Sequence, residues 1–281
     1  SSVRWADESD RRPMVQYYYE SDMDLFDSNI YAKGALVLNM LRQMLGYDAF
    51  WRTIRHYTNT YQFKNVESQD LKRVFEDVTG QNLDWFFDQW VYTGGLPHLD
   101  IKYKYNRRNQ HVKLTIRQIQ DVASSSLFRL PLTVLIDNGG DIVRQDIWIE
   151  EEESTFLIPS MRDPNMVLVD EGHIIPKRME FKKTQSELIY QSEHAPHVLD
   201  RIWAIERLEE IKQRKRSIEN ALVHALQKDP FYGVRVEAAE AFGKYKPKKG
   251  AEILMSSMQR QDNRVQRACI RSLNNYKTKE V

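Results

Sequence analysis

The hydrophobic periodicity of this sequence changes twice, and this succession constrains the fold more than any other feature. Residues 1–97 place apolar side chains at helical spacing, residues 98–178 alternate apolar and polar side chains as strands do, and residues 179–281 return to helical spacing. At 281 residues the chain is also longer than a usual single domain. We therefore predict a multidomain α+β protein with three domains, 1–97, 98–178 and 179–281.

The stretch from Asp27 to Gly46 predicts a long helix that is apolar almost all the way round, which is typical of a helix buried on every side. Asp27 or Ser28 is expected to cap its first amides, and Gly46 to end its last turn. Tyr31 lies in the first turn, beside Gly34, where the backbone permits close approach. The Tyr31 hydroxyl is a candidate for chemistry, and the same position suits a simple structural anchor.

Three further helices are predicted in the first 97 residues. One covers 48–57, the next begins at a Ser68 cap and ends at Gly80, and the last runs from Asn82 through the W-F-F-D-Q-W segment. We interpret the aromatic residues of that segment as core and not as a ligand-stacking surface.

Short alternating segments follow, with an Asn138-Gly139-Gly140 turn that joins two of them. About six such strands predict a small antiparallel β-sandwich. From Met179 onward no strand is predicted. The four adjacent glutamates at 150–153 suggest a solvated turn more than a cation site.

The last hundred residues contain an internal repeat. Helices are predicted over 184–193, 196–212, 217–228, 232–245, 249–259 and 263–276. Residues of one helix recur 31 positions later, namely Val234, Ala238, Phe242 and Tyr245 as Val265, Cys269, Leu273 and Tyr276. Helix pairs with a spine of small residues predict an α-solenoid of HEAT-like repeats. Cys269 lies on that spine, so we interpret it as a small core residue.

Composition and charge exclude several classes of function. The content of 41% hydrophobic and 29% charged residues is ordinary for a globular protein, and no apolar run reaches the roughly 18 residues of a membrane span. Residues 179–281 carry 20 basic and 14 acidic side chains, a basic face at most. The basic runs at 212–216 and 246–249 lack interleaved aromatic residues, so no nucleic-acid partner is predicted. The single cysteine excludes an internal disulfide, and the compartment stays open.

No complete catalytic set can be assembled from the residues alone. The seven histidines include no H-E-x-x-H pattern, and no second cysteine is available for zinc. His194 and His197 form H-A-P-H, but Pro196 separates them and no third ligand is evident, so we predict no metal site there. Phosphate-binding glycine loops and the G-x-S-x-G nucleophile motif are absent as well.

One ordered series of motifs resembles a known family. Tyr31, Lys33, Gly34 and Ala35 form the Y-x-K-G-A pattern, and L-V-L-N-M-L-R-Q-M-L-G-Y-D-A-F-W follows it. The series continues through Asp70-Leu71, T-G-Q-N-L-D-W-F-F-D-Q-W-V and the G-x-P of Gly95-Leu96-Pro97. This series resembles the aminopeptidase N family, the gluzincin zinc metallopeptidases, over roughly the first hundred residues. The later strands and helix pairs are similar to that family's later domains.

The resemblance implies a fold and an activity. It implies that 1–97 is the helical C-terminal part of a thermolysin-like catalytic domain, followed by the sandwich and the solenoid. Family members are hydrolases that remove N-terminal residues from peptides with a zinc ion held by an H-E-x-x-H helix and a further glutamate. The family tyrosine, which donates to the oxyanion of the tetrahedral intermediate, corresponds to Tyr31. The zinc ligands and the glutamate that binds the substrate amine have no counterpart in this sequence; in the family they precede the tyrosine.

Two interpretations follow. In the first, the chain is the C-terminal part of a metallo-aminopeptidase; it starts without an initiator Met, acts with the preceding part of the catalytic domain on peptide substrates, and by itself binds no zinc and is inactive. In the second, it belongs to a non-catalytic relative that uses the helical repeats as a protein-docking scaffold. The sequence assigns neither peptide specificity, oligomeric state nor compartment.

Overall fold

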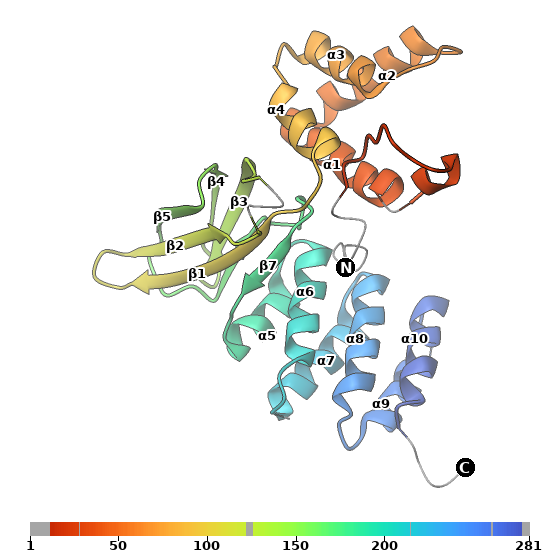
Figure 1. The fold of residues 1–281 in the computed structure, drawn as a ribbon. Helices are drawn as coiled ribbons and strands as arrows, with labels where there is room; N and C mark the ends of the chain where they lie inside the picture. Colours follow the sequence, from red (N-terminus) through yellow and green to blue (C-terminus); the bar gives the residue numbers. More distant parts are fainter. Residues whose placement is uncertain (1–11, 28, 122–125, 214, 260, 277–281) are drawn as a thin grey trace.

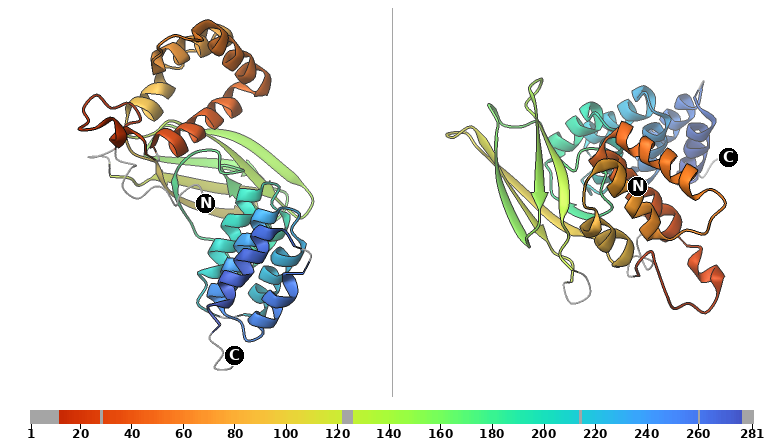
Figure 2. Two further views of the ribbon diagram at one scale, coloured as in Figure 1. Left: turned by 90° about the vertical axis from the view of Figure 1, so that its right-hand side faces the viewer. Right: turned by 90° about the horizontal axis from the view of Figure 1, so that it is seen from above.

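The computed structural model describes residues 12–27, 29–121, 126–213, 215–259 and 261–276. A layer of helices comes first along the chain, two β-sheets follow, and a row of paired helices comes last (Figure 1). In the left view of Figure 2 the first helices lie above the sheets and the last helices lie below them. Among the described residues, none of the helices has the length and apolar character needed to cross a membrane.

The first layer contains three long helices with two short helical segments before them and two after them. They are η2 (Asp22–Leu25), η3 (Asn29–Lys33), α1 (Gly34–Leu45), α2 (Tyr47–Tyr61), α3 (Ser68–Thr79), α4 (Asp84–Phe87) and η4 (Asp88–Tyr92). Gly46 and Gly80 follow α1 and α3 with φ of 83° and 68°. Because only glycine adopts such angles without strain, both predicted helix ends are confirmed.

The predicted first helix differs from the observed one in two respects. A single π-helical turn, η3, precedes α1, and Asp27 caps it by accepting the Ile30 amide at 3.3 Å; the alternative cap, Ser28, lies outside the described residues. The helix is also not buried on every side, because Leu38 is 36% exposed and Ala35 is exposed. The neighbouring elements cover only one side of the helix, so the prediction that it is buried on every side was wrong.

The predicted Ser68 cap of α3 is also wrong. Glu67 occupies the cap position and forms a capping box in which its own amide donates to Asp70 Oδ2 at 2.9 Å. Leu71 stands three residues after Ser68 and cannot complete a capping box, whereas Asp70 stands three residues after Glu67, so the reciprocal bonds form in the register that starts at Glu67.

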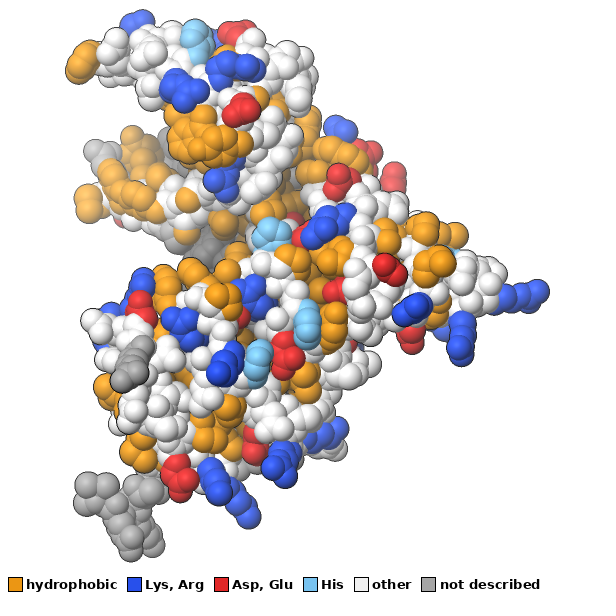
Figure 3. Space-filling model, turned by 180° about the vertical axis from the view of Figure 1, so that it is seen from behind, with side chains coloured by type: hydrophobic (Ala, Val, Ile, Leu, Met, Phe, Trp, Pro, Cys, Tyr) orange, Lys and Arg blue, Asp and Glu red, His pale blue; other side chains and the backbone are white. Residues whose placement is uncertain are grey.

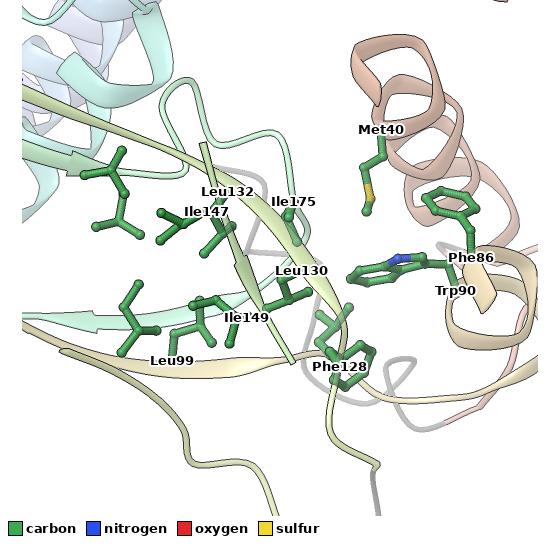
Figure 4. Close-up of a cluster of buried hydrophobic side chains, with 14 of the residues drawn as sticks. Met40, Phe86, Trp90, Leu99, Phe128, Leu130, Leu132, Ile147, Ile149 and Ile175 are labelled. Atoms are coloured by element: carbon green, nitrogen blue, oxygen red, sulfur yellow. The ribbon is translucent and has the colours of Figure 1, made fainter. Parts of the chain in front are cut away.

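A continuous apolar core runs from α1 into the sheets. Met40 of α1 points toward Phe86 and Trp90 of the α4–η4 segment (Figure 4). The Trp90 ring then lies 5.3 Å from the ring of Phe128, centroid to centroid. Phe86 and Trp90 are fully buried, as the core interpretation of W-F-F-D-Q-W expects. Burial of such a side chain contributes about 1.5–3 kcal/mol, so this contact is a principal link between helices and sheets.

The two sheets have the strand orders β5-β2-β1-β7 and β4-β3-β6. Their strands are β1 (His98–Asn106), β2 (His111–Gln118), β3 (Leu130–Asp137), β4 (Ile142–Ile149), β5 (Glu153–Pro159), β6 (Met166–Val169) and β7 (Arg178–Phe181). All neighbours are antiparallel except β1 and β7. Inward residues of both sheets, such as Ile101, Leu114 and Val134, belong to one core.

β7 contradicts the prediction that no strand follows Met179. Its four residues pair in parallel with β1, with Leu99 opposite Met179 and Ile101 opposite Phe181. A four-residue strand with two charged residues shows no periodic signal, and only the free edge of β1 gives it a partner.

Six helices complete the chain. They are α5 (Gln185–His194), α6 (Val198–Glu209), α7 (Arg216–Lys228), α8 (Tyr232–Tyr245), α9 (Gly250–Ser257) and α10 (Asn263–Leu273). All six predicted helices are present, and the small spine residues Ala238 and Cys269 are fully buried. The repeat also recurs in polar contacts, since Arg201, Arg235 and Gln266 each donate to the carbonyl five residues earlier.

The contact between α8 and α10 depends on a glycine. A Cβ placed on Gly243 would lie 2.6 Å from Cβ of Ser272, too close without separation of the helices. We expect Gly243→Ala to lower the free energy of unfolding by about 1–3 kcal/mol, as overpacking does. Denaturant unfolding measures this loss, with the exposed change Met255→Ala as the control. Equal stability of the two variants would contradict the close packing.

Candidate functional site

The Tyr31 side chain extends from η3, the turn that precedes α1. It is 63% exposed. Among the residues that the structure describes, none hydrogen-bonds to its hydroxyl. The hydroxyl therefore remains available as a donor, which a buried structural anchor would not be.

The turn that carries Tyr31 is fixed on its N-terminal side by Asp27. The Asp27 carbonyl accepts the Tyr31 amide at 3.3 Å. Its Oδ2 accepts Arg12 Nε at 3.0 Å, while its Oδ1 caps the Ile30 amide. One carboxylate thus joins the segment at Arg12 to the first turn of the helix.

Gly34 permits the second support. A Cβ at this position would lie 3.3 Å from Cε of Met14, so a larger residue would displace that side chain. The amides of Met14 and Val15 both donate to the Val91 carbonyl, at 3.0 and 3.2 Å. The segment at Met14 and Val15 is therefore held between Gly34 and the end of η4.

Lys33 orients the turn. It lies two residues from Tyr31, which on a helix corresponds to roughly the opposite side, and its side chain is fully buried. A lysine directed into the core leaves Tyr31 directed away from it. The Y-x-K-G-A spacing thus places an exposed hydroxyl, a buried lysine and a close contact at Gly34 within about one turn.

A cleft borders the other end of α1. It has a volume of about 280 Å³ and lies between Met40 and Met44 of α1, β3 and β4 of the second sheet, and the β6–β7 loop around Ile175. Seen from behind, the surface is hollowed between the first and the last helices, with apolar side chains around the hollow (Figure 3).

The two histidines of H-A-P-H have separate contacts. The His194 ring stacks on Tyr190 at 4.1 Å between centroids, and its Nδ1 lies 3.0 Å from the Tyr190 carbonyl. His197 precedes α6, with Nε2 3.5 Å from Glu171. The glutamates at 150–153 pair with arginines, Glu150 with Arg129 at 2.7 Å and Glu153 with Arg117 at 3.2 Å.

A buried group of charged residues around the β6–β7 loop was missed by the sequence analysis. Asp170, His173, Lys177 and Asp200 are nearly enclosed and contact one another. They lie on a loop and on α6, so no spacing in the sequence brings them together. A left-handed backbone at Asp170 and His173, with φ of 59° and 51°, was not readable from the sequence.

Comparison with known proteins agrees with the motif series at the tyrosine helix. The model of the peptidase family M1 domain matches residues 6–90, and a HEAT-repeat model matches 219–281. Aminopeptidase N of Lactococcus lactis subsp. lactis is 36% identical over 74 residues, which are 26% of this chain and 9% of that protein. The puromycin-sensitive aminopeptidase of Caenorhabditis elegans is 24% identical over 164 residues, 56% of this chain and 17% of that protein. The chain belongs to the aminopeptidase N family, peptidase family M1.

A solved M1-type structure shares the fold over nearly the whole chain. The crystal structure of Legionella pneumophila aminopeptidase A in complex with aspartic acid superposes with a TM-score of 0.75 and 15% identity, and covers 96% of this chain and 38% of that one. Rice aminopeptidase M1-D (Oryza sativa subsp. japonica) is 33% identical over 91 residues, 32% of this chain and 10% of that protein. The chain spans less than a fifth of the length of these curated relatives.

The M1 family is generally zinc-dependent, and the donors of this chain do not fit a zinc site. The sequence contains no H-E-x-x-H. In the part of the chain that the structure describes, no group of three or more His, Cys, Asp or Glu side chains converges to hold a metal.

Cys269 behaves as a core residue of the M1 chain's helical repeats. It is fully buried, and burial raises the pKa of its thiol to about 11. Because the thiolate is the reactive form, we expect the folded protein to resist a thiol reagent at pH 8 and to react once in urea. Cys269 is the single cysteine, so the assay reports on it alone. Rapid labelling of the native protein would contradict this burial.

Proposed function

We propose that this chain is the C-terminal portion of a zinc-dependent metallo-aminopeptidase that removes N-terminal residues from peptides. The proposal is supported by the M1 match over 6–90 and by the exposed hydroxyl of Tyr31 on a turn fixed on both sides. The exposed Tyr31 hydroxyl is the single observation that carries it. A tyrosine that only anchored the helix would have its side chain buried in the core, as the side chain of the neighbouring Lys33 is.

The proposed division of the chain follows the sequence analysis. Residues 1–97 form the helical C-terminal part of a thermolysin-like catalytic domain, 98–178 the β-sandwich, and 179–281 the HEAT-like repeats. We assign β7, Arg178–Phe181, to the sandwich because it pairs with β1, which moves the second boundary to residue 182.

In the proposed reaction the Tyr31 hydroxyl donates a hydrogen bond to the oxyanion that forms as the peptide carbonyl becomes tetrahedral. A donor placed before the reaction costs no reorganisation in the transition state and is generally worth about 3–4 kcal/mol. Zinc, when bound by the family's own ligands, supplies the activated water. This chain's contribution is the position of one donor and the scaffold that holds it.

The proposed partners are the preceding part of the catalytic domain and a peptide substrate. Apolar residues exposed around the tyrosine turn, including Phe26, Ile30 and Leu38, form a surface that the preceding part would cover. No nucleic-acid partner is proposed.

A non-catalytic scaffold based on the helical repeats is the second candidate. The two are distinguished by the gene sequence upstream of residue 1, where an intact H-E-x-x-H followed by a glutamate about twenty residues later indicates the enzyme. A degenerate pattern there would indicate the scaffold.

We expect Tyr31→Phe in the complete protein to lower kcat by about 10²–10³ with little change in KM, because the hydroxyl contacts only the transition state. Hydrolysis of an aminoacyl anilide measures both constants. Tyr47→Phe is the matched control, since Tyr47 is 67% exposed at the start of α2 and has no assigned role. A kcat for Tyr31→Phe equal to that of Tyr47→Phe would contradict the catalytic role and leave Tyr31 as a structural anchor of the helix.

The isolated 281-residue chain is expected to bind no stoichiometric zinc and to hydrolyse no aminoacyl anilide, because its sequence contains no H-E-x-x-H and its described residues bring no three metal donors together. Metal analysis after dialysis, together with the same assay, tests this. Retention of about one zinc ion per chain together with hydrolysis would refute the assignment of the metal site to another part of the protein.

A further inference from the structure

A buried cluster of charges joins the sheets to the first two of the C-terminal helices. We call it the joint cluster and define it by four carboxylates and three basic side chains. The carboxylates are Asp170, Glu171, Glu187 and Asp200, and the basic side chains are Lys177 and Lys183, which are buried, and Arg144, which is 48% exposed at the rim. His173 lies inside it.

The β6–β7 loop forms one side of the cluster. Asp170 folds the loop back, because its two carboxylate oxygens accept the amides of Ile174 and Ile175 at 3.2 and 3.0 Å. Its Oδ2 also pairs with Lys177. The loop is thus held in one conformation by a charged group that is 2% exposed.

Asp200 of α6 binds this loop. Oδ2 of Asp200 accepts the Gly172 amide at 2.9 Å, and Oδ1 lies 3.4 Å from Nε2 of His173. The His173 ring packs on Trp203 of the same helix, 6.3 Å between centroids. Asp200 is 1% exposed, so solvent does not compensate its charge.

α5 ties the cluster to both sheets. Glu187 accepts the Tyr103 hydroxyl of β1 at 2.9 Å and the Val167 amide of β6 at 3.1 Å. Lys183 lies 3.1 Å from Glu187 and donates to Gln191 at 2.7 Å. The attachment of α5 and α6 to the sheets therefore depends on buried polar contacts.

The charges of the joint cluster do not balance. Four carboxylates face three cations, and an unpaired buried charge is strongly unfavourable. Neighbouring groups do not supply the missing cation, because Arg201 pairs with Asp229 at 2.7 Å and His197 faces Glu171, which Arg144 already pairs at 2.8 Å. One proton on either Asp200 or His173 restores the balance.

Burial shifts the pKa values of Asp200 and His173 in opposite directions. Burial raises the pKa of Asp200 to about 7, an effect that exceeds the lowering by the Gly172 amide and that Asp170 reinforces. Burial, with Lys177 and Lys183 nearby, holds the pKa of His173 well below its usual value. In the packed arrangement of the structure, the closed joint, these shifts favour the proton on Asp200 and a neutral His173 below about pH 7.

In the open joint, α5 and α6 are separated from the sheets, and the side chains of His173 and Asp200 are both in water. His173 then holds a proton up to about pH 6.5, and Asp200 loses its proton above about pH 4. We propose that His173 and Asp200 form a compensating pair, in which one proton lies on His173 in the open joint and on Asp200 in the closed joint. Closure then neither takes up nor releases a proton between about pH 4.5 and 6.5, and the attachment of the C-terminal helices stays constant over that range.

Each single substitution removes one titrating group, so the titration of the remaining group is no longer compensated. With Asp200→Asn, closure must release the His173 proton, so acidification from pH 6.5 opens the joint about tenfold per pH unit. With His173→Gln, closure must protonate Asp200, so the joint opens about tenfold per pH unit as pH rises from 4.5 to 6.5. The double variant removes both titrations and is flat again.

Hydrogen exchange in the full protein measures the opening. Protection factors of α5 and α6 amides, corrected for the intrinsic pH dependence of exchange, are compared at pH 4.5, 5.5 and 6.5 with those of α2 in the same sample. Asp141→Asn and His224→Gln serve as controls, since both residues are exposed and outside the cluster. Opposite slopes for the two single variants, and flat wild-type and control profiles, are expected.

Parallel slopes, or flat profiles in both single variants, would overturn the proposal. Should Asp200→Asn not fold, the His173→Gln slope and an infrared measurement on the unmodified protein still decide. The carbonyl band of a protonated aspartic acid is expected at pH 5.5 and lost above pH 8, with specific isotope labelling of aspartate. Absence of that band at pH 5.5 would reject the shared proton.

Discussion

The apolar contact between Trp90 and Phe128 is the constraint on which the arrangement of the first half of the chain depends. It joins the core under α1 to the core between the sheets, so the two regions bury their side chains in one continuous cluster. Arg129 reinforces the junction by lying between the rings of Trp85 and Trp148, 4.9 and 4.7 Å from their centroids. The turn that bears Tyr31 is therefore positioned relative to the sheets and not only relative to its own helix.

The second junction, between the sheets and the C-terminal helices, rests on a different kind of interaction. Dispersion and the hydrophobic effect hold the first junction, which no titration alters. The joint cluster uses buried carboxylates and lysines, whose energy depends on protonation and on complete pairing. The β6–β7 loop takes part in both regions, because Asp170 and Ile175 border the cleft beside α1 while Gly172 binds Asp200 on α6.

Much of the candidate site could be predicted, because it is local. The Y-x-K-G-A spacing places Tyr31 and Lys33 on opposite sides of one turn, and the resemblance to the aminopeptidase N family rests on those same residues. Its supports could not be predicted. Arg12 reaches Asp27 across fifteen residues, and Met14 reaches Val91 across far more, so neither contact leaves a periodic trace in the sequence. The joint cluster was missed for the same reason.

The sequence by itself determined the kinds of elements and their order. Helical and strand periodicity, glycine helix ends at Gly46 and Gly80, and the 31-residue repeat are local properties of the chain, fixed by backbone stereochemistry and side-chain spacing. Tertiary structure alone decided which faces are buried. It left part of α1 exposed although its residues are apolar, and it made Arg178–Phe181 a strand because β1 offered an open edge. It also enclosed Asp200 and His173 together, since burial depends on what the rest of the chain places around a residue.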